Sequence, residues 1–192
     1  MTLSALIIAR NEEKKIEFTL KSLNFADEIV VILDRSIDKT KKICARYTKK
    51  IYEGSWKSEG KRRNFGISKC RSEWILEIDA DELVTKPLEK EIVQKLTFNN
   101  FDFYYVPLTN FIGNKKITNG WMACLAPDGK FCLFKKGTKN WIDGSVHPQY
   151  QIKGKKGETL SNSLNHHLSK DISELLSKFN RNTSLYACDL RK

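Results

Sequence analysis

A short apolar segment that ends in a cluster of acids constrains this chain more than any other feature. Residues 73–82 read EWILEIDADE, and the run at 74–78 suits a strand that is buried on both faces. Three carboxylates follow it, on Asp79, Asp81 and Glu82. Carboxylates this close repel one another unless a cation lies between them, and oxygen ligands favour Mg²⁺ or Mn²⁺ over zinc. The alternative is a solvated acidic turn that opens a helix.

Apolar runs alternate with amphipathic segments through the first half of the chain. The patterns predict strands at 3–9, 28–33, 50–52 and 73–78, and helices at 16–23, around 43–47 and at 58–69. Asn11 is the expected cap of the first helix, and Ser36 or Asp38 that of the second. The alternation predicts an α/β fold, with a doubly wound, mostly parallel sheet that carries helices on both faces.

Polar clusters at 10–13, 34–38 and 79–82 each follow a predicted strand. Since ligands of such sheets bind outside the carboxyl ends of the strands, one site could gather all three clusters.

The second half of the chain has a different pattern. A helix is expected after Pro87, and residues 102–107 and 129–135 are expected to form antiparallel strands. Asp171 and Glu174 resemble a capping box at the start of a terminal amphipathic helix. This helix either packs its apolar face on the sheet or lies on an anionic membrane surface.

Composition restricts the class of protein. A chain of 192 residues that is 40% hydrophobic fits one domain with its own core. The net charge of +11 favours anionic partners: nucleotide phosphates, phosphorylated glycans, an anionic membrane surface or nucleic acid. Five scattered cysteines without a Cys-x-x-Cys pair indicate reduced thiols in the cytosol. The sequence predicts neither a signal peptide nor a membrane-spanning segment.

Five segments, taken in order, resemble one protein family. They are IIARNEE, EIVVILDRSIDKT, KRRNFGISKCRSEWILEIDADE, GWMACLAPDGKFCLFKK and WIDGSVHPQY. Together they resemble the family 2 glycosyltransferases with a GT-A fold, in particular the bacterial branch that includes lipopolysaccharide-core β-1,4-glucosyltransferases. The resemblance implies a single GT-A domain over residues 1–192. Residues 1–86 would form its nucleotide-sugar-binding half, and residues 87–192 its acceptor-side half with the terminal helix.

The resemblance also implies a reaction. A hexose, with UDP-glucose as the expected donor, would pass with inversion to a glycan or lipid-linked acceptor in lipopolysaccharide or other cell-surface polysaccharide synthesis. The enzyme would act in the cytoplasm or peripherally at the inner membrane face, with Mg²⁺ or Mn²⁺ stabilising the diphosphate leaving group. Asp79-Ala80-Asp81 matches the family's Asp-x-Asp motif, which implies a ribose contact for Asp79 and the metal for Asp81.

Four further residues are implied in donor binding. Asn11 and Glu12 follow the first strand, and Asp34 ends the second, where the family places an acid against the base or ribose. Arg63 matches a basic position that touches the base or the diphosphate. The alternatives are a helix cap for Asp34 and an exposed basic helix face for Arg63. The loop at 34–38 is one residue shorter than the common form of the family.

An inverting transfer needs a carboxylate that accepts the proton of the attacking hydroxyl. By resemblance Asp128 is the first choice and Asp143 the second, although Pro-Asp-Gly is also a strong turn signal for Asp128. Many relatives carry Glu directly after the histidine that corresponds to His147, whereas this chain has Pro148. His147 is expected to complete the metal site with Asp81, with a structural hydrogen-bonding role as the alternative.

Several side chains and function classes stay open. A structural role is the default for His166 and His167, while Trp121 and Trp141 would either stack on sugars or be buried. The missing Glu makes a degenerate member, which binds a nucleotide sugar or glycan without turnover, a real alternative. A nucleic-acid-binding domain fits the charge, but no recognition motif is present and no nucleic acid partner is expected. A nucleotidyltransferase would carry a glycine-rich basic loop after the first strand, which this chain lacks.

Overall fold

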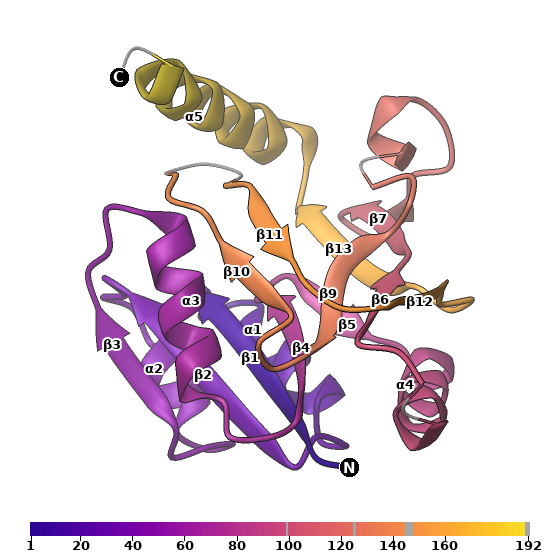
Figure 1. Cartoon of the computed structure of the whole chain (residues 1–192). Coiled ribbons are helices and arrows are strands. Elements are labelled where there is room, and N and C mark those ends of the chain that lie inside the picture. Colours follow the sequence, from indigo (N-terminus) through magenta and orange to yellow (C-terminus); the bar gives the residue numbers. More distant parts are fainter. Residues whose placement is uncertain (99, 125, 145–147, 191–192) are drawn as a thin grey trace.

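A seven-stranded sheet forms the centre of the computed structural model, which describes residues 1–98, 100–124, 126–144 and 148–190. The strand order is β12-β6-β9-β4-β1-β2-β3 (Figure 1). Its parallel part consists of β1 (Leu3–Ala9), β2 (Glu28–Asp34), β3 (Ile51–Gly54) and β4 (Trp74–Asp79). All four predicted strands are therefore confirmed, within one or two residues at their ends.

Helices cover both faces of this sheet, as the alternation predicts. On one face, α1 (Ile16–Ser22), α2 (Thr40–Cys44) and α4 (Lys86–Phe98) contribute side chains to a core that includes Ala5 and Ile7 of β1. On the other, α3 (Glu59–Lys69) packs Ile67 against Leu6 and Ile32. Successive residues of β1 enter opposite cores because side chains alternate along a strand. The doubly wound α/β fold is confirmed.

The second half of the chain completes the sheet and adds two smaller ones. Strand β9 (Lys130–Lys135) runs antiparallel to β4 and to β6 (Phe103–Val106), and β12 (Lys156–Thr159) pairs parallel with β6. The predicted antiparallel pair is thus confirmed. A second sheet has the order β5 (Glu82–Val84), β13 (Leu164–Ser169), β7 (Leu108–Ile112) and β8 (Lys115–Lys116). A 3₁₀ turn, η1 (Trp121–Cys124), and the hairpin of β10 (Lys139–Trp141) and β11 (Tyr150–Ile152) complete the set.

The loops after β1 and β2 correct the predicted helix caps. Asn11 does not cap α1, which begins at Ile16 without a side-chain cap. Its backbone has φ 54°, and its Oδ1 accepts a hydrogen bond from the backbone N–H of Ile37 at 2.9 Å. Asn11 therefore ties two strand ends together. Asp38 does bond the start of α2, since its Oδ1 accepts from the N–H of Thr40 at 3.0 Å.

The terminal helix α5 (Ile172–Leu190) begins with the predicted capping box. The N–H of Glu174 donates to Asp171 at 2.8 Å, and the Glu174 carboxylate accepts from the N–H of Lys170 at 2.7 Å. In Figure 1 the helix lies at the opposite end of the molecule from the N-terminus. Leu175 is buried, whereas other apolar side chains of α5 are exposed: Ile172, Leu176 and Tyr186. Among the described residues, no helix is long and apolar enough to cross a membrane.

The strand order creates a crevice at one edge of the sheet. The chain passes outward from β1 to β2 and β3, and then crosses to β4 on the other side of β1. Strand β1 leads into α1, whereas β4 leads into β5 of the second sheet, and this divergence opens a ligand crevice at the carboxyl ends of β1 and β4. The acid cluster of residues 79–82 lies directly at this position.

Candidate functional site

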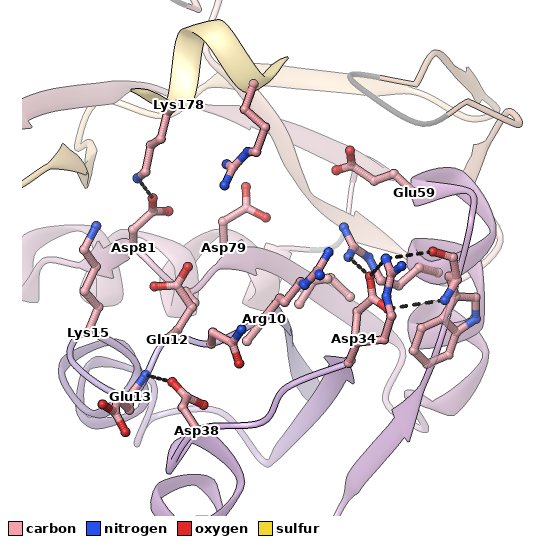
Figure 2. A pocket seen from close by; sticks show the side chains of 18 of the residues that line it. Arg10, Glu12, Glu13, Lys15, Asp34, Asp38, Glu59, Asp79, Asp81 and Lys178 are labelled. Atoms are coloured by element: carbon pink, nitrogen blue, oxygen red, sulfur yellow. Dashed lines mark hydrogen bonds and ion pairs between the residues drawn. The ribbon is translucent and has the colours of Figure 1, made fainter. Parts of the chain in front are cut away.

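A pocket of about 1250 Å³ opens at the carboxyl ends of β1, β2 and β4 (Figure 2). The structure brings all three polar clusters of the sequence to this pocket. Its lining includes Asn11 and Glu12 after β1, Asp34 at the end of β2, and Asp79 and Asp81 at the end of β4. Basic side chains from α3 and α5 complete its wall: Arg62, Arg63, Lys178 and Arg181.

Asp79 is held by two cations of the protein itself. Its Oδ1 accepts from Arg63 Nη2 at 3.0 Å, and its Oδ2 accepts from Lys130 Nζ at 2.8 Å. Lys130 also donates to the buried Glu82 at 2.6 Å. Burial raises the pKa of Asp79, but Arg63 and Lys130 outweigh it and hold that pKa far below its usual range. Burial instead prevails at Glu82, whose pKa is raised.

A second layer of charges lies beneath Asp79. Glu77 of β4 is buried and accepts from Arg63 Nη1 at 2.9 Å and from Lys139 Nζ at 2.8 Å. The indole N–H of Trp141 also donates to Glu77, at 3.1 Å, and its ring lies 5.0 Å from the Arg63 guanidinium. Both Arg63 and Trp141 are therefore bound into a network that supports Asp79. Burial lowers the pKa of Lys139, against the opposing effect of Glu77.

Asp81 has looser partners than Asp79. Its Oδ1 lies 3.9 Å from His166 Nε2, and its Oδ2 lies 3.9 Å from Lys178 Nζ. Both separations exceed a hydrogen bond. The backbone carbonyl of Asp81 accepts from the N–H of His167 at 2.8 Å, which fixes β13 beside the acid cluster. Of the two carboxylates of the Asp-x-Asp motif, that of Asp81 is therefore the one without a short ion pair to a described residue.

The orientation of His166 follows from a chain of hydrogen bonds. The Asn110 Nδ2 donates to the carbonyl of Met122 at 2.8 Å, so the Oδ1 of Asn110 faces His166 Nδ1 at 2.9 Å. An amide oxygen can only accept, and the proton of a neutral imidazole therefore sits on Nδ1. This leaves the lone pair of Nε2 directed toward Asp81. Metal-binding histidines commonly have this arrangement.

The residues around Asp81 fit a divalent cation that the substrate helps to hold. Among the described residues, no three His, Cys, Asp or Glu side chains form a complete metal-binding group. Mg²⁺ is ordinarily bound by one or two carboxylates together with substrate phosphates, and Asp81 with His166 matches such a partial set. The candidate ligand His147 lies outside the described residues.

Glu12 faces the same region from the end of β1, and Figure 2 shows its carboxyl group directed toward Asp81. Its backbone N–H donates to Thr40 Oγ1 at 2.8 Å, and its carbonyl accepts from the N–H of Ile16 at 2.9 Å. Burial and then the charge of Asp81 raise the pKa of Glu12 to about 7. Two carboxyl groups that disfavour each other's charge would both gain from a cation between them.

Asp34 is enclosed by positive groups at the far side of the pocket. Its two oxygens accept from Arg35 at 2.9 and 3.0 Å, from Arg62 at 2.7 Å and from the N–H of Trp56 at 3.3 Å. Burial raises the pKa of Asp34, but Arg35 and the other donors outweigh it and lower that pKa. The helix-cap alternative for Asp34 does not apply. Its carboxylate binds Arg35, the backbone N–H of Trp56 after β3 and Arg62 of α3 rather than the start of α2.

Comparisons with known proteins identify the chain. A sequence model described as "Glycosyl transferase family 2" matches residues 4–147, which is more than half of the chain. The chain belongs to this family. A Rickettsia bellii "Uncharacterized glycosyltransferase" is 30% identical over 99% of this family 2 chain and 68% of its own length. The Rhizobium meliloti "Lipopolysaccharide core biosynthesis glycosyltransferase LpsC" is 31% identical over 50% of this chain and 37% of LpsC.

A solved structure of another protein has the same fold. The crystal structure of Staphylococcus aureus TarS 1–349 in complex with UDP-GlcNAc aligns with a TM-score of 0.51 and 24% identity, over 62% of this chain and 37% of that one. The predicted GT-A fold is confirmed. The chain spans about two thirds of the Rickettsia bellii protein and little more than a third of LpsC or TarS.

The two carboxylates favoured as the base of a family 2 enzyme lie elsewhere. Within the described residues, neither Asp128 nor Asp143 lines the pocket. Asp128 is exposed in a turn in which the N–H of Gly129 donates to the carbonyl of Ala126 at 2.9 Å, in agreement with the turn interpretation. Asp143 is exposed and pairs with Lys61 at 3.1 Å.

Sequence reasoning missed three side chains of this site. Lys130, Lys178 and the pocket-facing His166 reach the acid cluster from β9, α5 and β13, which lie far from it in the sequence. The one available signal was basic or imidazole character within the acceptor-side half, which does not distinguish them from the many other lysines of the chain.

Proposed function

We propose that this family 2 protein is an inverting glycosyltransferase that moves a hexose from a nucleotide-sugar donor, UDP-glucose first, to a glycan acceptor. The observation that carries the proposal is Asp81, whose carboxylate faces a pocket of about 1250 Å³ at the crevice of a GT-A sheet. Large pockets at this position are where open α/β sheets bind nucleotides.

The metal proposal rests on two side chains of the described structure. Asp81 and His166 would hold Mg²⁺ or Mn²⁺ together with the donor diphosphate, and His147 is kept as a further candidate. When bound, the cation would neutralise charge on the departing diphosphate. Asp79, fixed by Arg63 and Lys130, would present its remaining acceptor capacity to the ribose.

The nucleoside would occupy the far side of the pocket. Asp34, Arg62 and the ring of Trp56 all line that side, and they offer hydrogen-bonding and stacking groups for a base and ribose. Asn11 and Glu12 would close the floor between the nucleoside and the diphosphate. UDP is our first choice of nucleotide because the related TarS was crystallised with UDP-GlcNAc.

For the base, Asp128 remains our first proposal and Asp143 the second. The Asp128 turn leads directly into Lys130, whose Nζ donates to Asp79 of the pocket, although neither Asp128 nor Lys130 lines the pocket itself. An acceptor bound between the loop and the donor would bring its hydroxyl to the Asp128 side. Asp143 instead forms an ion pair with Lys61 of α3.

The acceptor proposal follows the relatives. LpsC acts in lipopolysaccharide core biosynthesis by its name, and a lipid-linked glycan at an anionic inner membrane face would suit the net charge of +11. The exposed apolar side chains of α5 would support peripheral attachment to that surface in the cytoplasm.

A thermal-shift panel tests the donor site. UDP-, GDP-, ADP- and dTDP-sugars would be added with and without Mn²⁺ to the wild type, to Asp81→Asn and to a control, Glu158→Gln, in which an exposed carboxylate is neutralised. A ligand that binds the folded state raises Tm by mass action. We expect one nucleotide class to stabilise the wild type and the control in the presence of Mn²⁺, and this gain to be lost in Asp81→Asn.

Activity separates the enzyme from a degenerate binder. Donor hydrolysis or transfer that disappears with chelator would support the transferase. Binding without turnover in the full chain would support a degenerate member. This alternative is suggested by Pro148, which stands where many relatives carry Glu. The absence of any response to all four donor classes would contradict both.

A further inference from the structure

One face of α5 closes the pocket from the side opposite the sheet. Glu174, Lys178, Arg181 and Asn182 of α5 all line the pocket, at spacings of four, three and one residues, which place them on one helical stripe. The exposed apolar residues Ile172 and Leu176 do not line the pocket and so lie off this stripe. The polar stripe of α5 therefore belongs to the pocket wall.

Lys178 is aimed at the acid cluster. Its Nζ donates to the backbone carbonyl of Leu168 at 2.6 Å and lies 3.9 Å from Asp81 Oδ2, and Figure 2 shows it pointing toward Asp81. The carbonyl contact fixes the ammonium group at the mouth of the pocket while leaving two of its three N–H donors for another acceptor. Lys178 is thus positioned without being neutralised by a short ion pair.

Three other arginines of the pocket are already paired. Arg35 and Arg62 bind Asp34, and Arg63 binds Glu59, Glu77 and Asp79: three carboxylates for one guanidinium. The guanidinium of Arg181, in contrast, has neither a hydrogen bond nor an ion pair to any described residue, although it lines the pocket. Arg10, Lys14, Lys15 and Lys57 also line the pocket without an ion pair to a described residue, but they belong to the loops after β1 and β3. Lys178 and Arg181 are therefore the cations of α5 that remain available to an anionic ligand.

We propose that Lys178 and Arg181 of α5 bind the diphosphate of the nucleotide donor, beside Asp81. The proposal rests on the proposed function and adds to it the residues that recognise the phosphates. A guanidinium binds phosphate oxygens in pairs, and an ammonium binds as a compact charge, so the two side chains complement a diphosphate. Both come from the acceptor-side half, and donor binding would consequently join α5 to the nucleotide-binding half.

Isothermal titration with UDP and with uridine, both in the presence of Mn²⁺, tests this assignment. Lys178→Gln and Arg181→Gln remove the positive charges but keep length and polarity. We expect each variant to weaken UDP binding by about tenfold and the double variant by about a hundredfold, the loss of one or two hydrogen bonds to a charged group. The affinity for uridine, which has no phosphate, should stay unchanged.

The matched control is Lys170→Gln, at the exposed start of the same helix, where Nζ lies 3.8 Å from Asp171 and outside the pocket lining. It should bind UDP as the wild type does. Equal UDP affinity in the wild type and the double variant would overturn the assignment, and so would an equal loss for UDP and uridine, which would mean that α5 only shapes the pocket. If the wild type itself binds none of UDP, GDP, ADP and dTDP, the proposed function fails instead.

Discussion

Two acids that stand one residue apart have opposite surroundings in this protein. Asp79 is paired at short range with Arg63 and Lys130, whereas Asp81 faces His166 and Lys178 across gaps of 3.9 Å. The difference arises because Asp79 ends β4 beside β9, while Asp81 follows in the connection to β5. A carboxylate whose charge is already balanced is suited to orienting a neutral group, and an incompletely paired one is suited to a cation.

Lys130 is the residue on which this division depends. We expect Lys130→Met to lower the free energy of unfolding at pH 7 by about 3 kcal/mol, because Glu82 and Asp79 would lose their shared cation in a buried setting. Adding Glu82→Gln should recover much of this loss, since the uncompensated buried charge is removed. Urea unfolding measures both effects.

The control for that series is Lys86→Met, which removes an exposed lysine paired with Glu89 and should change stability by about 0.5 kcal/mol or less. Equal stability of Lys130→Met and the double variant would contradict the assigned role of Glu82.

At the scale of elements, the start of the central strands is held by one carboxylate. Glu28, at the beginning of β2, accepts from Ser4 of β1, from Lys50 before β3, and from the N–H groups of Arg71 and Ser72 before β4. Burial raises the pKa of Glu28, but these donors outweigh it and lower that pKa to about 2.

This shift predicts a pH-dependent stability. A folded pKa below the unfolded value of 4.5 stabilises the native state at neutral pH, and the contribution is lost as the pH falls from about 4.5 to about 2. We expect Glu28→Gln to lower the free energy of unfolding by about 1–2 kcal/mol at pH 7, and the difference from the wild type to shrink as the pH falls and to vanish only below about pH 2. A difference that persists unchanged at low pH would show that the carboxylate charge is not its cause.

At the scale of the whole molecule, the net positive charge and the exposed apolar side chains of α5 both fit the proposed acceptor at a membrane surface. The structure turns Lys178 and Arg181 into the pocket, so the terminal helix would contact a membrane through its exposed apolar side chains instead of these cations. The net charge of +11 would supply longer-range attraction to anionic lipid.

Vesicle co-sedimentation tests this proposal. We expect binding to vesicles that contain anionic lipid, but not to zwitterionic ones, and a decrease as salt shortens the Debye length from about 10 Å at 0.1 M to about 3 Å at 1 M. Leu176→Ser should weaken binding, while Val93→Ser, an equally exposed change on α4, should not. If both variants bind as the wild type does, α5 has no part in the attachment.

The sequence alone determined the order of strands and helices through β4, the two-sided sheet, the capping box of α5 and the acid cluster at a strand end. These features depend on periodicity, capping and short-range spacing, all of which are local. The convergence of the polar clusters at 10–13, 34–38 and 79–82 could also be predicted, because parallel strands place their carboxyl ends at one edge of the sheet.

Only the tertiary structure decided which side chains meet those clusters. His166 reaches Asp81 through the pairing of β13 with β5, and Lys130 reaches Asp79 where β9 runs antiparallel beside β4. Asn11, predicted as a cap, instead bonds the loop after β2. Strand register and helix docking over such separations are set by the packing of the whole core, which leaves no signal in the residues on either side of a contact.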